Sequence, residues 1–244
     1  MPRTVRLTLF GIVTFVLFAV VFAPASLVRH VIPRDGFVTI AAPTGTLWRG
    51  SGDLGVGGTP VGTIGWSFAP GTLLGASLGY DLAVKGEHID LTGRASAGVS
   101  SAHADVGGTL DTALLADTLA RYDIRLPGTI AVEHLEVSGP YGARLPQTRG
   151  ELHWSGGAVD YTLSGHVHHV TLPPLVGFVD SSSGQPEISV YQVNDKMPLL
   201  LARITPDGLA TIGITKQFTK MLGEPWPGSE PDHAVVLEVG EKLF

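Results

Sequence analysis

Residues 61–84 read VGTIGWSFAPGTLLGASLGYDLAV, and this stretch decides the fold. In it, large apolar side chains alternate with small or polar ones, first over residues 64–68 and again over residues 78–84. Alternation with a period of two is typical of a β-strand that buries one face and exposes the other. Pro70 and Gly71 separate the two runs and predict a turn. The stretch therefore predicts two antiparallel strands, each with one apolar face.

The same alternation recurs along the rest of the chain. It is found at Ile130 and Val132, at Leu135 and Val137, at Val159 and Tyr161, and over residues 199–204, 209–214 and 235–239. Residues 206–208, Pro-Asp-Gly, separate two of these runs and predict a tight hairpin. Glycine is frequent, at 32 of 244 residues, as expected of a sheet with many turns and bulges. We therefore predict a mainly β fold, built as a curved and mostly antiparallel sheet.

Helical signals are few. Asp111 is expected to cap a helix over residues 112–122, because its side chain can accept a hydrogen bond from the first helical turn. A second short helix is expected over residues 215–222, ended by Gly223. The sheet is therefore expected to carry one or two short helices.

The N-terminal segment predicts export of the chain. Residues 7–28 contain no charged side chain and are mostly apolar, and a helix of roughly 20 such residues spans a bilayer core. Arg3 and Arg6 precede the segment, so the positive-inside rule keeps the N-terminus in the cytoplasm. We therefore expect a single-pass protein of the cell inner membrane with the bulk of the chain in the periplasm.

These observations divide the chain into four parts. They are a cytoplasmic N-terminus at residues 1–6, a transmembrane anchor at 7–28, a linker at 29–36 and a periplasmic β domain at 37–244. The alternative for the first segment is a cleaved signal peptide, because Ala23 and Ala25 flank Pro24 as in a small-x-small cleavage site. The length of the apolar run favours a retained anchor, and either interpretation exports the same domain.

Composition excludes several classes of function. The chain has 22 acidic and 16 basic residues, with a net charge of −6. It therefore lacks the basic face that a nucleic-acid partner requires. It contains no cysteine, which excludes disulfides, thiolate metal sites and thiol catalysis.

The sequence predicts no enzyme, cofactor or metal site. Carboxylates are scattered singly, and there is neither a G-x-S-x-G nor a P-loop motif. Residues 50–55 match G-x-G-x-x-G, but the Gly- and Pro-rich residues after them cannot form the helix that this motif needs. His166 and His168 would share one face of a strand, next to His169. Because no third metal ligand accompanies them, a solvated or interface strand is favoured over a metal site.

Four side chains near the C-terminus are predicted to contact a partner. Trp226 lies in irregular sequence and is a better interface candidate than Trp66, which lies in an alternating run, although core packing remains the alternative for Trp226. Val235, Leu237 and Val239 belong to the last predicted strand. An open strand edge can pair with a strand of another chain, which is the binding mode we expect here.

An ordered set of short motifs follows the apolar segment. The motifs are GTLWRG at residues 45–50, GWSFAP at 65–70, LPG at 126–128, GELHW at 150–154 and GEPW at 223–226. In order and spacing, this set resembles the type II secretion system protein N family over roughly residues 40–240. The residues to which the resemblance assigns a structural role are Gly45, Leu47, Trp48, Gly50, Trp66 and Pro70.

The resemblance implies a non-enzymatic inner-membrane subunit of the type II secretion system. Such a subunit supports assembly of the platform that exports folded periplasmic proteins across the outer membrane of Gram-negative cells. Its expected partners are the other inner-membrane subunits, proteins C, L and M, and also the secretin.

The family is also similar to AsmA-type periplasmic proteins, whose curved β-sheets hold lipid. This likeness implies an AsmA-like open barrel or groove, and it gives an alternative function as a periplasmic lipid-binding or lipid-transfer module. A concave face covered by helices would remove the lipid site. An open apolar face would favour it.

Overall fold

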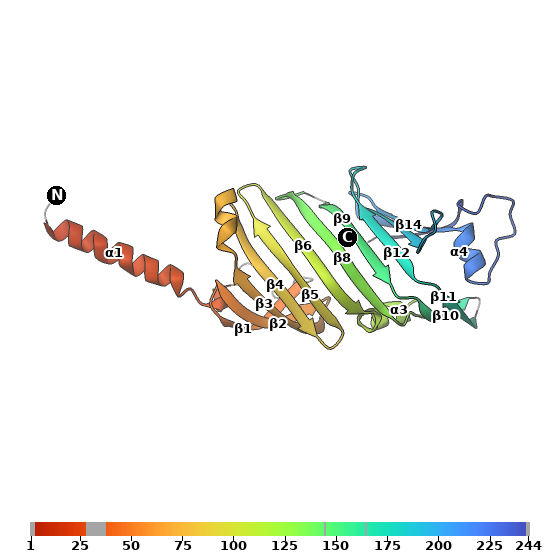
Figure 1. Ribbon diagram of the computed structural model, residues 1–244, viewed down its shortest axis with the longest axis horizontal. Coiled ribbons are helices and arrows are strands. Elements are labelled where there is room, and N and C mark those ends of the chain that lie inside the picture. The colour runs from red at the N-terminus through yellow and green to blue at the C-terminus, as the bar shows by residue number, and fades with distance from the viewer. Residues whose placement is uncertain (1–2, 28–37, 144, 164, 243–244) are drawn as a thin grey trace.

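The computed structural model confirms a mainly β, antiparallel architecture with few short helices (Figure 1). It describes residues 3–27, 38–143, 145–163 and 165–242. The described chain forms one open sheet of thirteen strands and a second sheet of three strands.

The large sheet is a meander in which every strand is antiparallel to its neighbours. In spatial order its strands are β1 Val38–Gly45, β2 Arg49–Val56, β3 Thr59–Phe68, β4 Leu78–Gly86, β5 Ile89–Ala97, β6 Ser101–Asp111, β8 Thr129–Pro140, β9 Gln147–Trp154, β12 Leu175–Asp180, β13 Glu187–Gln192, β14 Pro198–Ile204, β15 Leu209–Thr215 and β16 Val235–Lys242. The small sheet has the order β11 His166–Leu172, β10 Gly157–Leu163 and β7 Ile124–Arg125. The hairpin of β10 and β11 leaves the large sheet after β9, and β12 re-enters it beside β9.

The helices are short apart from the first. They are α1 Arg3–Val21, α3 Ala116–Ala120 and α4 Lys216–Met221, with 3-10 turns at Ala25–Leu27, Pro70–Gly75 and Thr112–Leu115. The cap predicted at Asp111 is confirmed, since its Oδ1 accepts a 2.8 Å hydrogen bond from the Ala113 amide. The single helix predicted over residues 112–122 is instead a 3-10 turn followed by α3. The helix α3 ends at Ala120, before the predicted end at residue 122. The chain turns into β7 at Asp123, which takes a left-handed conformation with a φ of 55°.

The N-terminal segment forms a helix whose bounds differ from those of the predicted anchor at residues 7–28. The helix α1 ends at Val21, and Pro24, which lacks an amide hydrogen, forms an isolated bridge with Thr46. Ala25 is buried in the following 3-10 turn. Within residues 3–27 and the other described ranges, no helix is both long enough and apolar enough to cross a membrane. The predicted linker at residues 29–36 lies outside the described residues.

One face of the large sheet is polar. Directly paired residues of antiparallel strands point to the same face, so the strand registers define rows of side chains across the sheet. From β2 to β16, one unbroken row is Arg49, Ser67, Asp81, Arg94, Asp105, Glu136, Arg149, Asp180, Glu187, Arg203, Thr211 and Gly240. Within this polar row, Arg94 binds Asp81 at 2.7 Å and Arg203 binds Glu187 at 3.2 Å.

The opposite face is apolar, as the adjacent row shows. It runs through Gly50, Trp66, Leu82, Gly93, Val106, Leu135, Gly150, Val179, Ile188, Ala202, Ile212 and Val239. A shift of one residue in any strand would exchange that strand's contributions to the two faces. The hydrophobic pattern therefore determines the register across the whole sheet.

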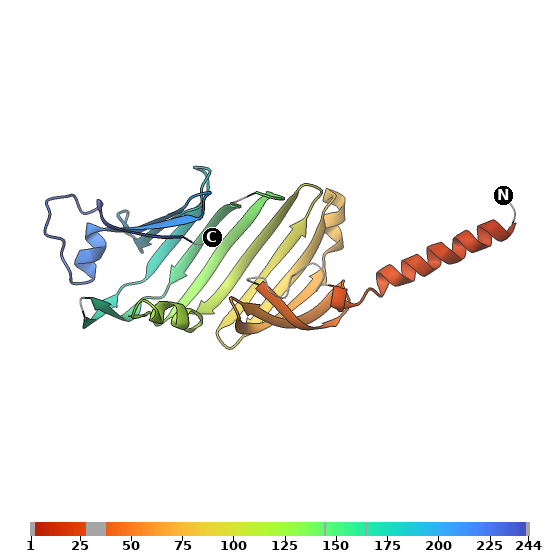
Figure 2. The same ribbon diagram turned by 180° about the vertical axis from the view of Figure 1, so that it is seen from behind.

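The sheet is curved, with its apolar face on the inside. Figures 1 and 2 show that both ends of the sheet bend toward the same side of its middle strands. Glu241 of β16 belongs to the apolar face by register, and its carboxylate accepts a 2.8 Å hydrogen bond from Tyr122, which follows α3. Because a side chain of this face at the sheet edge reaches an element near its middle, the apolar face is the concave one.

One end of the apolar face is covered. Trp154 of β9 packs with Val159 and Leu172 of the small sheet, and with Phe218 of α4. Elsewhere on this face Leu78 and Leu237 are exposed, whereas Trp66 at the N-terminal end of the sheet is buried.

The strand β8 explains a break in the sequence pattern. The alternating pairs Ile130 with Val132 and Leu135 with Val137 belong to this one strand. A β-bulge places both Glu133 and His134 opposite Gly107, so the alternation changes phase after Val132.

The predicted hairpin at residues 206–208 is confirmed between β14 and β15, where Thr205 donates its amide to the Leu209 carbonyl at 2.9 Å.

Candidate functional site

Of the residues predicted to bind a partner, three lie on the C-terminal edge strand and the fourth in the loop before it. Val235, Leu237 and Val239 lie on β16 and are 38%, 45% and 51% exposed. Trp226 lies in the loop between α4 and β16 and is 36% exposed. We call α4, residues 222–234 and β16 the C-terminal clasp.

Of the two edges of the sheet, β16 is the better candidate for pairing with another strand. Among the strands of the described ranges it pairs with β15 alone, so its other side presents backbone amide and carbonyl groups in an extended strand. The opposite edge, β1, is interrupted by Pro43 and by a register break next to Ala42, which has a φ of 44°. Bulges and proline protect an edge strand against pairing with other chains.

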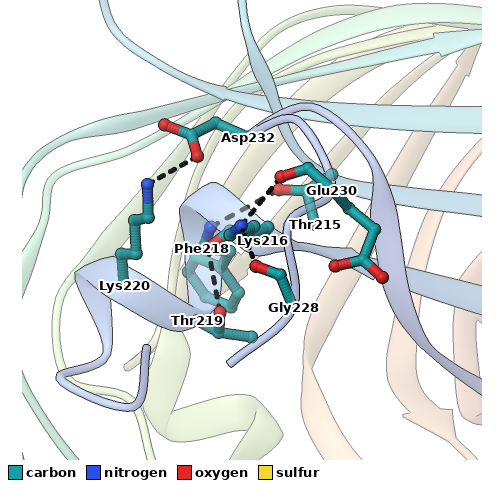
Figure 3. A network of polar contacts seen from close by, with 8 residues as sticks. All are labelled: Thr215, Lys216, Phe218, Thr219, Lys220, Gly228, Glu230 and Asp232. Carbon is teal, nitrogen blue, oxygen red and sulfur yellow. Dashed lines mark hydrogen bonds and ion pairs between the residues drawn. The ribbon is translucent and has the colours of Figure 1, made fainter. Parts of the chain in front are cut away.

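A buried lysine holds the clasp together (Figure 3). Lys216 opens α4 and is 8% exposed, and its Nζ donates to the carbonyls of Gly228 at 2.6 Å and Glu230 at 2.8 Å. A buried ammonium group requires such acceptors, because removing it from water without them is costly. These two hydrogen bonds therefore hold the part of the loop that follows Trp226 against the start of α4.

A second set of contacts fixes α4 to residues 232–234, which directly precede β16. Thr215 caps α4 by accepting a 3.4 Å hydrogen bond from the Phe218 amide, and the Lys216 amide donates to the Ala234 carbonyl at 3.0 Å. Lys220 forms a 2.5 Å ion pair with Asp232. The hydrogen bond from Lys220 holds the pKa of the Asp232 carboxyl below its ordinary value.

The residues to which the resemblance assigned a structural role gather at the other end of the sheet. The Trp66 indole donates to the Thr46 carbonyl at 3.2 Å, and the Trp48 indole donates to the Val20 carbonyl of α1 at 2.7 Å. The Leu47 amide donates to the Ala23 carbonyl at 2.8 Å. These contacts join the end of α1 to the first two strands.

Close packing accounts for the glycines and the proline in these motifs. A Cβ at Gly50 would lie 2.6 Å from Cζ2 of Trp66, and Gly45 has a φ of 87°. Pro70 begins the 3-10 turn that connects β3 to β4. In the corner formed by residues 45–50 and 65–70, backbone atoms therefore pack closely against one another and against the Trp66 ring.

His168 and His169 contact groups other than histidine. His168 stacks on Tyr161 with ring centroids 5.0 Å apart, and its Nδ1 lies 3.1 Å from Glu224. Nδ1 of His169 lies 2.6 Å from Asp160. The structure therefore gives His168 and His169 separate acidic neighbours.

A different group of potential metal ligands was missed by sequence reasoning. Asp105 of β6 lies beside His134 and Glu136 of β8, and one ligand atom from each of the three lies within 4.8 Å of the others. Only the pairing of β6 with β8 brings Asp105 to the other two side chains. The alternation of His134 with Glu136 was the only signal available in the sequence.

With this geometry described, the chain can be compared with known proteins. A family model described as type II secretion system (T2SS), protein N, matches residues 37–222. The chain belongs to this family. The resemblance inferred from the ordered motifs is thereby confirmed over residues 37–222, a range that does not include the GEPW motif at residues 223–226. Comparison with curated proteins and with solved structures gave no match.

The residues matched by the protein N family model include every strand from β1 to β15. The match begins beside β1 and ends just after α4, so it includes the corner at residues 45–50 and 65–70. Residues 223–242, which carry Trp226 and β16, lie beyond it. Membership of the protein N family supports a role in type II secretion and hence in protein transport.

Proposed function

We propose that this protein N family member is a non-enzymatic inner-membrane subunit that supports assembly of the type II secretion platform. The observation that carries the proposal is the family match over most of the β domain. In this role the chain binds other subunits, proteins C, L and M and also the secretin, and it promotes export of folded periplasmic proteins across the outer membrane.

Membrane attachment is part of the proposal. Apolar side chains of α1 and the residue after it are exposed, including Phe10, Phe15, Phe18 and Phe22. An exposed apolar surface of this kind is typical of a segment that contacts lipid or protein. Arg3 and Arg6 precede the apolar residues, which supports a cytoplasmic N-terminus and a periplasmic β domain.

The proposed contact with partners is strand addition at β16. A partner strand laid along this edge continues the sheet by backbone hydrogen bonds. The exposed side chains of Leu237 and Val239 would then contact the apolar side chains of the added strand. Anchoring both partners in one membrane raises their effective concentration, so a modest edge contact is sufficient.

Catalysis is not part of the proposed role. Four charged side chains of the polar row form cross-strand pairs, Arg94 with Asp81 and Arg203 with Glu187. Pairs of this kind on an open sheet stabilise its register. They are exposed and differ from the enclosed groups that are typical of active sites.

A second candidate function is binding or transfer of lipid. The observation that favours it is the apolar concave face, whose row of Gly and apolar residues continues from β2 to β16. The three-stranded sheet and α4 cover one end of this face, and Leu82 and Leu135 in its middle strands are half-buried. An acyl chain is the kind of ligand that such an apolar surface can bind.

One crosslinking experiment separates the two functions. Photo-crosslinkers are placed at Trp226 and Glu238 for the edge, because Glu238 lies on the exposed face of β16 away from the concave side, and at Leu82 and Leu135 for the concave face, in the full chain in its native membrane. Adducts with other secretion subunits at the edge positions, identified by mass spectrometry, are the expected result. Phospholipid adducts at the two concave positions without protein adducts would support the lipid function instead.

The matched control is a crosslinker at Thr92. This residue lies on the polar face of β5, opposite Gly107, and is exposed. Secretion subunits recovered equally from Thr92 and from the edge positions would contradict strand addition at β16.

A further inference from the structure

We propose that Asp105, His134 and Glu136 bind a divalent transition-metal ion on the polar face of the sheet. Nδ1 of His134 lies 3.0 Å from a carboxylate oxygen of Asp105, and Nε2 lies 3.3 Å from one of Glu136. The three ligand atoms lie within 4.8 Å of one another. Ligands bound tetrahedrally at about 2 Å lie roughly 3.3 Å apart. Since one ring nitrogen binds the ion, the carboxylate that contacts the other nitrogen must rotate toward it to complete the site.

The backbone prepares this arrangement. The β-bulge of β8 places His134 opposite Gly107, which has no side chain to occupy the space beside the imidazole. Bulges commonly redirect a side chain toward a functional site. Asp105 and Glu136 face each other directly in the register of β6 and β8. The three ligands thus project from adjacent strands of one rigid sheet.

Neighbouring charges leave these ligands available. Arg94 lies opposite Asp105 but directs Nε and a terminal nitrogen to Asp81. Arg149 lies opposite Glu136 on the other side, next to Asp180 in the polar row. Two carboxylates around one neutral imidazole balance the charge of a divalent ion.

The ligand types indicate the class of metal. An imidazole nitrogen favours zinc and its neighbours in the first transition row, whereas magnesium and calcium prefer sites made of oxygen alone. The three side chains are about half exposed, so water completes the coordination. Three protein ligands and water form an open site, and Zn²⁺ is the appropriate probe.

Zinc binding by the full chain in detergent tests the proposal. Equilibrium dialysis against Zn²⁺ in the presence of excess Mg²⁺, with bound metal measured by mass spectrometry, compares wild type with His134→Ala, Asp105→Asn and Glu136→Gln. Each variant is expected to bind one Zn²⁺ fewer per chain than wild type. The matched control is His153→Ala, because His153 contacts a single carboxylate, Glu151, at 2.7 Å. It should bind as much zinc as wild type.

A measurement on the wild-type chain makes the test independent of how the variants fold. Zn²⁺ should protect His134 from modification by diethyl pyrocarbonate and leave His153 reactive, as mapped by peptide mass spectrometry. Equal reactivity of His134 with and without Zn²⁺ would overturn the proposal. So would unchanged zinc stoichiometry in a folded His134→Ala chain, or displacement of the zinc by Mg²⁺.

Discussion

At the scale of single residues, Lys216 connects the last described strand to the rest of the protein. Its ammonium group is buried and donates to two carbonyl oxygens of the loop that leads to β16. Hydrogen bonds from a charged group contribute more than neutral ones, and their loss leaves buried acceptors unpaired. The position of Trp226 therefore depends on a side chain outside its own loop.

Replacement of this lysine should weaken the whole clasp. We expect Lys216→Met to lower the free energy of unfolding by about 2 kcal/mol, because both carbonyls lose a charged donor while the methionine fills a similar volume. Urea unfolding followed by tryptophan fluorescence measures the change.

Lys220→Met is the matched control on the same helix. The side chains of Lys220 and Asp232 are both nearly half exposed, and pairs of this kind contribute little because water screens them. Equal losses of stability in the two variants would contradict the role assigned to Lys216.

At the scale of elements, close approach between strands shapes the N-terminal end of the sheet. Gly50 of β2 lies against the Trp66 ring of β3, and a Cβ there would also collide with the Thr44 carbonyl oxygen of β1. The Trp66 indole is fixed in turn by its hydrogen bond to Thr46. Neither the ring nor the carbonyl can move freely.

Gly50→Ala should therefore destabilise the domain. We expect a loss of about 2 kcal/mol in the free energy of unfolding, typical of an added methyl group in a packed site. The measurement is urea unfolding of the full chain.

Gly65→Ala is the control for a glycine in the adjacent strand. The nearest atom to its Cβ would be the Ala83 carbonyl oxygen at 3.8 Å, so the methyl group meets no obstacle. A loss at Gly65 as large as that at Gly50 would show that backbone conformation, rather than steric contact, determines the effect.

At the scale of the whole molecule, the sheet separates two surfaces along its full width. Adjacent rows, one charged and one apolar, extend together from β2 to β16. On the concave apolar side, Tyr122 donates a hydrogen bond to Glu241, and the two residues are 119 positions apart in the sequence. This bond links the last strand to the middle of the molecule.

The bond between Tyr122 and Glu241 predicts a dependence of stability on pH. Donation to Glu241 raises the pKa of Tyr122 above its ordinary value of 10.0. The protonated phenol is thus favoured in the folded state. The stabilisation is present below pH 10 and is lost as the pH rises through the raised pKa. The difference in unfolding free energy between wild type and Tyr122→Phe should therefore fall toward zero at alkaline pH.

The measurement is denaturant unfolding of both chains in a series of buffers from about pH 8 to about pH 11, chosen to bracket the pKa of tyrosine. Glu241→Gln removes the charge that favours the protonated phenol and should reduce the pH dependence. A difference between wild type and Tyr122→Phe that stays constant over the series would contradict the assignment.

Much of the fold could be predicted because its signals are local. Alternation at Ile64, Trp66 and Phe68 indicates a strand whatever its neighbours are, and Asp111 caps its turn through a contact two residues away. Residues 112–122 were harder, because the chain leaves the helix to reach β7, and that destination is a tertiary property. The type of each element was therefore more predictable than its end.

The sequence by itself determined that this chain forms antiparallel strands with one apolar and one polar face, and its ordered motifs led to the protein N family. Only the tertiary structure decided which side chains meet. Sequence spacing suggested His166 and His168 as a pair, whereas strand pairing brought Asp105 to His134 and Glu136. It also made β16, the strand that follows the Trp226 loop, an edge of the large sheet. The reason is that alternation is set by backbone geometry within a strand, whereas register and curvature depend on packing between residues far apart in the chain.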